Sequence, residues 1–182
     1  RFRARAGAYE VLSNPVLVSA QPPAQRAYWG DIHIHTELGH ANWQGGSGAK
    51  NYALAEGFAD LDFASLSEHY STDVRGWMDE LVPATLAFDR PGEFVTFLAT
   101  ETGMIGGHVN YYLWGSAPFE MFDGRNNFAS REAINDNLRA RGVQALSVPH
   151  HFLLLDPVDW RNSDRARLRL AEIYSYHGSS EE

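Results

Sequence analysis

The feature that most constrains this 182-residue chain is the placement of its histidines. Each of the eight lies at the carboxyl end of a predicted strand or in the loop that leaves it: His33, His35, His40, His69, His108, His150, His151 and His177. Histidines that merely filled a core would not be sorted in this way. In α/β barrels the carboxyl ends of the strands converge on one site. The pattern therefore predicts that these side chains meet in one place.

The clearest of these strands covers residues 29–36. Ile32 and Ile34 alternate with Asp31, His33 and His35, which is the period-two pattern of a strand. His33 and His35 therefore point to the same face. Two imidazoles held two residues apart on a rigid strand form a pair of nitrogen ligands for a divalent metal. If the pair stood alone, one histidine could equally be buried in the core and the other lie on the surface. The histidines at the other strand ends argue against that interpretation.

The remaining pattern predicts an α/β fold with a mostly parallel sheet or barrel, because strands alternate with helical segments. Further strands are predicted over residues 61–66, 94–99, 109–114, 143–148 and 170–174. Ser47 and Ser130 are expected to cap two helices, and a short helix is expected around residues 77–82. Glu68 and Glu101 lie at strand ends and could supply oxygen ligands.

Composition narrows the chemistry of the site. The chain has 44% hydrophobic and 21% charged residues, as an ordinary globular protein does. No apolar run approaches the roughly eighteen residues of a membrane span, and the net charge of -8 argues against a nucleic-acid-binding surface. Without cysteine, the ligands are nitrogen and oxygen atoms, which suit Zn, Mn or Fe better than Ca or Mg. They are too many for one tetrahedral ion, so we infer two or three ions.

Several segments resemble the motifs of the PHP (polymerase and histidinol phosphatase) family. The resemblance is carried by Asp31-x-His33-x-His35-Thr36 with His40, by Ser67-Glu68-His69, by Glu101, by His108 after a Gly-Gly pair, and by Pro149-His150. One branch of that family has motifs similar to two longer segments of this chain, Trp-Gly-Asp-x-His and Glu-Ile-Tyr-Ser-x-His-Gly-Ser-Ser-Glu. The resemblance covers about residues 28–182, while residues 1–27 are predicted to be the tail of a preceding β-rich region and a linker.

This resemblance implies an irregular, seven-stranded (β/α) barrel with a two- or three-metal site that hydrolyses phosphoesters. Carried over residue by residue, it implies that His33, His35 and Glu101 are ligands, with Glu101 bridging two ions. It also implies a second pair of ligands, His40 and His69, and a third, His108 and His150. His151 and His177 match the branch and are expected either to line the pocket as donors or to support a ligand.

Two departures from the family pattern bear on these expectations. Glu68 stands where the family usually has Asp, so its carboxylate reaches further. The family's last motif, Asp-x-His on a late strand, is absent. Five of the seven expected main strands are predicted, because the strand over residues 109–114 is an additional one. The sequence therefore predicts residues 28–182 to be the N-terminal part of such a domain, an incomplete barrel that lacks its last strands.

The sequence predicts a metal-dependent hydrolase. The activity that we expect first is hydrolysis of a phosphoester in a small-molecule substrate. A metal-bridging hydroxide would attack phosphorus, and His108, His151 or His177 would protonate the leaving oxygen. Because metal uptake needs neutral imidazoles, the metal affinity is expected to fall below roughly pH 6.

Two alternatives remain open. Amidohydrolases also begin with His-x-His, but they commonly need a carboxylated lysine at a later strand end, and the only lysine, Lys50, follows the first motif directly. The second alternative is a metal-binding module that is inactive in this truncated form.

Overall fold

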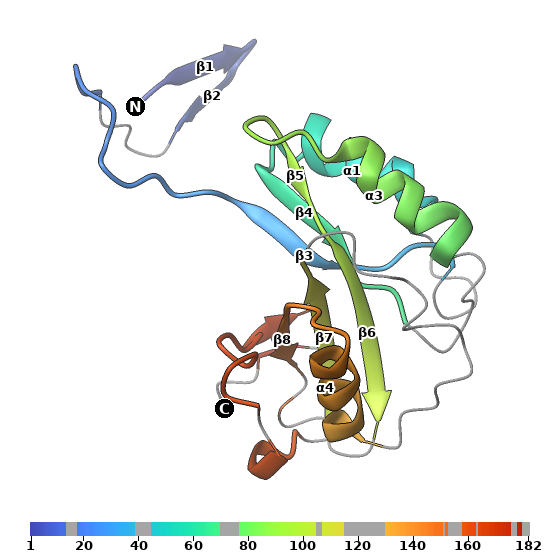
Figure 1. Cartoon of the computed structure of the whole chain (residues 1–182). Helices are drawn as coiled ribbons and strands as arrows, with labels where there is room; N and C mark the ends of the chain where they lie inside the picture. Colours follow the sequence, from blue (N-terminus) through green and yellow to red (C-terminus); the bar gives the residue numbers. More distant parts are fainter. Residues whose placement is uncertain are drawn as a thin grey trace.

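The computed structural model of the chain describes residues 1–13, 18–38, 45–69, 77–104, 107–114, 130–150, 152, 158–162, 164–175 and 178–179. The first two strands, β1 (Arg3–Ala6) and β2 (Tyr9–Leu12), form an antiparallel hairpin that extends away from the other elements (Figure 1). A second short hairpin, β9 (Tyr174–Ser175) with β10 (Gly178–Ser179), lies near the other end of the chain. The assignment of residues 1–27 to a preceding β-rich region stays a prediction.

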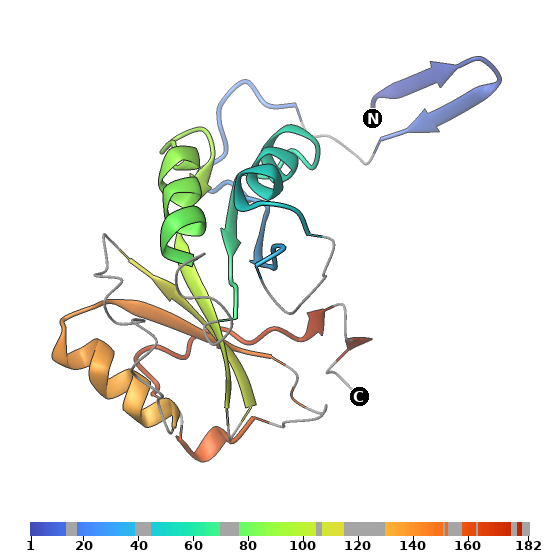
Figure 2. The same cartoon turned by 90° about the vertical axis from the view of Figure 1, so that its right-hand side faces the viewer.

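The first of two larger sheets is parallel. Its strands are β3 (Gly30–Ile34), β4 (Phe63–Leu66) and β5 (Val95–Thr96), in the order β3-β4-β5. Helices α1 (Gly48–Gly57) and α3 (Val82–Phe88) lie side by side along this sheet, and a π-helical turn, η1 (Trp77–Leu81), leads into α3 (Figure 2). Ser47 caps α1 by accepting a hydrogen bond from Lys50 N, as the sequence predicts.

The second sheet is antiparallel, with strands β6 (Leu98–Met104), β7 (Gly107–Leu113) and β8 (Ala145–Pro149). Helix α4 (Arg131–Ala140) joins β7 to β8 and begins at the predicted cap, Ser130. The expectation of a mostly parallel sheet is wrong for this half. β7 begins only three residues after the last residue of β6, and so short a connection permits a hairpin but no parallel crossover.

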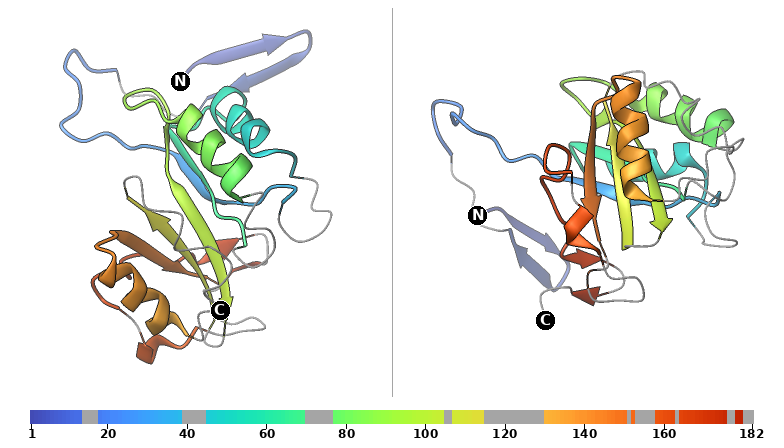
Figure 3. Two further views of the ribbon diagram at one scale, coloured as in Figure 1. Left: turned by 45° about the vertical axis from the view of Figure 1, so that its right-hand side comes forward. Right: turned by 60° about the horizontal axis from the view of Figure 1, so that its bottom comes forward.

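The two sheets meet where β4 lies beside β6. Beyond the end of β4, His69 pairs in parallel with Glu101 of β6. The predicted strand 94–99 is divided at Phe97, whose carbonyl oxygen accepts a hydrogen bond from Ser65 Oγ (2.6 Å), and β6 then runs on into the second half (Figure 3). The chain is therefore a mixed α/β structure, as predicted. Among the residues that the structure describes, the sheets do not close into a ring.

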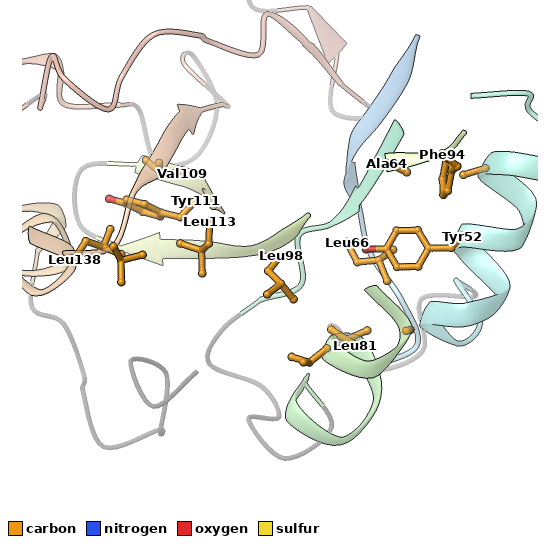
Figure 4. Packing of buried hydrophobic residues seen from close by; sticks show 14 of the residues in the cluster. Tyr52, Ala64, Leu66, Leu81, Phe94, Leu98, Val109, Tyr111, Leu113 and Leu138 are labelled. Carbon is orange, nitrogen blue, oxygen red and sulfur yellow. The ribbon is translucent and has the colours of Figure 1, made fainter. Parts of the chain in front are cut away.

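One hydrophobic core extends under both halves. Tyr52 of α1 packs over Leu66 and Phe94, and Leu138 of α4 packs over Tyr111 of β7 (Figure 4). A smaller cluster, which includes Ala99, Tyr112 and Val148, lies on the face of the second sheet that carries the side chains described below. The larger core thus fixes the strands, and the site is built on the opposite face of β6 and β7.

Truncation of Leu138 tests this account of the core. Leu138 is fully buried, whereas Leu86 of α3 is 60% exposed. We expect Leu138→Ala to lower the free energy of unfolding by about 2–5 kcal/mol, because it removes buried methyl groups and leaves a cavity. Leu86→Ala is the matched control and should change the free energy by less than about 1 kcal/mol. Chemical denaturation of both variants measures the difference, and equal losses would contradict the assignment of Leu138 to the core.

One predicted strand is not formed. Residues 170–173 are not part of a strand, and only Tyr174 of the predicted strand 170–174 lies in a strand, β9. Leu170 and Ile173 are half exposed, so the apolar side chains of this segment are not buried in the core. Within the described ranges, no helix is both long and apolar enough to cross a membrane.

Candidate metal centre

A single carboxylate forms the middle of the site. Glu101 lies on β6 and is 2% exposed. Five histidines each place a ring nitrogen within 3.4 Å of its oxygens: His33, His35, His69, His108 and His150. Three of these nitrogens contact Glu101 Oε2 and two contact Oε1. A buried carboxylate surrounded by imidazoles has the ligand atoms of a transition-metal site.

The first two histidines come from one strand. His33 lies in β3 and His35 directly follows it, and their ring centroids are 5.2 Å apart. The His33 Nε2 atom lies 3.4 Å, and the His35 Nε2 atom 2.9 Å, from Glu101 Oε2. The period-two alternation of residues 29–36 therefore places both rings on one side of the strand, as the sequence predicts.

The other three histidines come from three different strands. His69 follows β4 and stacks on His35, with the ring centroids 4.9 Å apart. His150 follows β8, and its backbone N–H donates to the carbonyl oxygen of His108 in β7 (3.2 Å). His108 Nδ1 lies 2.6 Å, and His150 Nε2 3.0 Å, from Glu101 Oε1. His108 stands near the start of an antiparallel strand, beside the end of β6, and so reaches the same edge.

Two triplets of these side chains could each hold a metal ion. Their ligand atoms lie within 4.8 Å of one another in each triplet: His33, Glu101 and His150 in the first, and His35, His69 and Glu101 in the second. Glu101 belongs to both. Each triplet therefore offers nitrogen and oxygen ligands for a divalent metal ion.

Two further carboxylates contact the histidines from the far side of their rings. Glu68 Oε1 lies 2.9 Å from His35 Nδ1, and Glu172 Oε2 lies 2.7 Å from His33 Nδ1. The sequence suggested Glu68 as an oxygen ligand, and in the structure its carboxylate contacts the ring nitrogen of His35 that faces away from Glu101. The sequence assigned no role to Glu172, which lies in a predicted strand and is the first residue of the Glu-Ile-Tyr-Ser-x-His segment.

The charges of the site depend on these contacts. Burial alone would lower the pKa of His33, but its hydrogen bonds to Glu101 and Glu172 raise the pKa to about 9. Burial also opposes the shift at His35, whose hydrogen bonds to Glu101 and Glu68 raise its pKa to about 9. Burial would raise the pKa of Glu101, and the surrounding imidazoles hold it far below its usual range. Without metal, the protonated rings of His33 and His35 therefore offset part of the negative charge of the carboxylates around them.

The predicted site residues fall into two groups. The structure brings six of them together, with five histidines around one glutamate: His33, His35, His69, His108 and His150 around Glu101. His40, His151 and His177 lie outside the described residues, and their roles stay predictions.

Comparisons with known proteins add information on the fold. No protein-family model matches the chain, and no curated protein matches it. Among solved structures, it is similar to PsfC from Pseudomonas syringae, with a TM-score of 0.52 and 18% identity over 73% of this chain. The chain spans 59% of the length of PsfC. It is also similar to a candidate metal-dependent phosphoesterase from Bifidobacterium adolescentis, with a TM-score of 0.46 and 14% identity over 85% of this chain and 79% of that one. The similarity to PsfC concerns the fold alone.

Proposed function

We propose that this chain carries the metal site of a metal-dependent hydrolase whose substrate is a phosphoester. The observation that supports the proposal most is the sharing of Glu101 between two His/Glu triplets. The same residues lie in the segments that resemble the PHP family, so geometry and resemblance support one assignment. We further propose that the two sheets are part of an incomplete barrel of the PHP type, with two or three Zn, Mn or Fe ions.

The two triplets would hold the ions, with Glu101 joining the two positions. When bound, a pair of divalent ions supplies a lowered pKa for water and polarises the oxygens of a phosphoryl group. His108 contacts Glu101 through Nδ1, and its side chain is 24% exposed, against 2% for Glu101. Where it is not bound to an ion, it would donate a proton to the leaving oxygen, as would His151 or His177.

Metal content and a substrate panel test this proposal together. We expect the purified chain to contain about two equivalents of Zn, Mn or Fe, since two triplets share Glu101. We expect a chelator to remove both the ions and the hydrolysis of phosphomonoesters or diesters, and added metal to restore them. Elemental analysis and release of a chromogenic phenol measure the two properties.

Each other outcome has a distinct meaning. Two bound ions with hydrolysis of amides or lactones, but of no phosphoester, would favour an amidohydrolase-like activity. Two bound ions without any turnover would leave a metal-binding module. The absence of bound metal after incubation with Zn, Mn and Fe would refute the proposed site itself.

A further inference from the structure

The imidazoles of His33 and His35 are held from both sides. Each ring directs Nε2 toward Glu101 Oε2 and uses Nδ1 for a hydrogen bond to a different carboxylate. The partner of His33 Nδ1 is Glu172 (2.7 Å), and that of His35 Nδ1 is Glu68 (2.9 Å). A proton on Nδ1 leaves the Nε2 lone pair free for a metal, so these contacts fix the tautomer and the ring orientation that a ligand needs.

Glu68 is tied to the triplet that contains His35 and His69. It precedes His69 in the chain, and its Oε2 atom accepts hydrogen bonds from Thr36 N (2.7 Å) and from Thr36 Oγ1. Its backbone carbonyl accepts from Glu101 N (2.9 Å). The carboxylate that orients His35 is therefore fixed by the residue that follows His35 and by the strand that carries Glu101.

Glu172 has the same relation to the other triplet. Its backbone N–H donates to the carbonyl oxygen of Pro149 (3.0 Å), and Pro149 directly precedes His150. The segment that carries Glu172 is thus attached to the end of β8, beside the second histidine of its triplet. Its side chain is 20% exposed, whereas that of Glu68 is 2% exposed.

We infer that Glu172 is the positioning residue for the metal position built on His33, Glu101 and His150, and that Glu68 is the positioning residue for the one built on His35, His69 and Glu101. Each position has its own orienting carboxylate, although both share Glu101. The two positions can therefore be weakened one at a time. This inference rests on the proposed metal site and does not depend on the identity of the substrate.

Titration of the metal-free chain with Co²⁺ tests the inference. Calorimetry and the visible absorption of the bound ion monitor the binding. The variants are Glu172→Gln, Glu68→Gln and the double variant. We expect each single variant to weaken one of two binding events by about 10- to 100-fold and to leave the other within about threefold. The two variants should affect different events, with different absorption changes, and the double variant should show both losses.

The control is Glu93→Gln, which removes an exposed carboxylate paired with Arg90 (3.3 Å) and should leave both events unchanged. If Glu172 merely stabilised the fold, its variant would unfold at a lower temperature and bind both ions normally, which would overturn the inference. Equal weakening of both events by each variant would overturn it as well. Should Glu68→Gln fail to fold, Glu172→Gln together with the more disruptive Glu172→Ala still decides whether one event is affected alone.

The wild-type titration separates this inference from the proposed function. Two Co²⁺ events that respond to the variants as expected, without hydrolysis of any phosphoester, would support the inference and refute the proposed activity. Hydrolysis of phosphoesters by the wild type, with variants that leave both events unchanged, would do the reverse. A wild-type chain that binds no Co²⁺ would overturn both.

Discussion

Glu101→Gln is expected to remove both metal positions in one substitution. The carboxylate of Glu101 belongs to both triplets, and its two oxygens contact five imidazoles. A neutral amide keeps the size of the side chain but loses the charge that balances the ions. We expect the affinity for each ion to fall by roughly 100-fold or more, and metal-dependent hydrolysis to fall to background. Elemental analysis after desalting measures the retained metal, and titration with Co²⁺ measures the affinity of each position.

Two comparisons make this result specific. Glu93→Gln makes the same chemical change at an exposed side chain and should retain both ions. Glu172→Gln should lose affinity at one position only, so the loss of both is particular to the shared carboxylate. If Glu101→Gln is folded, as circular dichroism would report, and still binds two ions with unchanged affinity, then Glu101 does not join the positions.

Local periodicity was sufficient to predict the start of the site. The alternation around Ile32 and Ile34 predicts a strand with His33 and His35 on one face, and β3 and its two rings match it. The helix caps at Ser47 and Ser130 were predictable for the same reason, because each depends on a hydrogen bond across three residues. These features are encoded within a few residues, where neither register nor topology matters.

The features that the sequence did not predict depend on distant contacts. The sequence predicted that His108 lies in the site, but not how it reaches it: β7 returns antiparallel to β6, whereas the alternation of strands and helices favoured parallel strands. Glu172 contacts His33 across 139 positions of the chain, through a segment that is attached to Pro149 and forms no strand there. Apolar spacing carries no information on such pairings. The sequence therefore identified Glu172 only as part of a predicted strand and of the Glu-Ile-Tyr-Ser-x-His segment, without a role.

The metal affinity is expected to rise with pH up to about pH 9, well above the range predicted from ordinary histidines. Hydrogen bonds to Glu101 and to Glu172 or Glu68 overcome the effect of burial and raise the pKa of His33 and of His35 to about 9. Below that pH each ring carries a proton on Nε2 that an incoming ion must displace. One proton displaced per ion makes the affinity of each position rise about tenfold per pH unit between roughly pH 6.5 and 9. With ordinary imidazoles it would level off near pH 7.

Titration with Mn²⁺ at pH values from 6.5 to 9.5 measures this slope, and calorimetry in buffers of different ionisation enthalpy counts the protons released. At pH 7.5 we expect about two protons for two ions, one from His33 and one from His35. His150 should add none, because burial lowers its pKa. The stability that the metal-free chain gains from the raised pKa values is fully present below pH 6.5 and lost as the pH rises through 9, so its unfolding temperature should fall over this window. If the affinity is constant above pH 7 and no protons are released, the two rings are neutral before the metal binds. A neutral imidazole already has a free nitrogen lone pair and releases no proton when the ion binds.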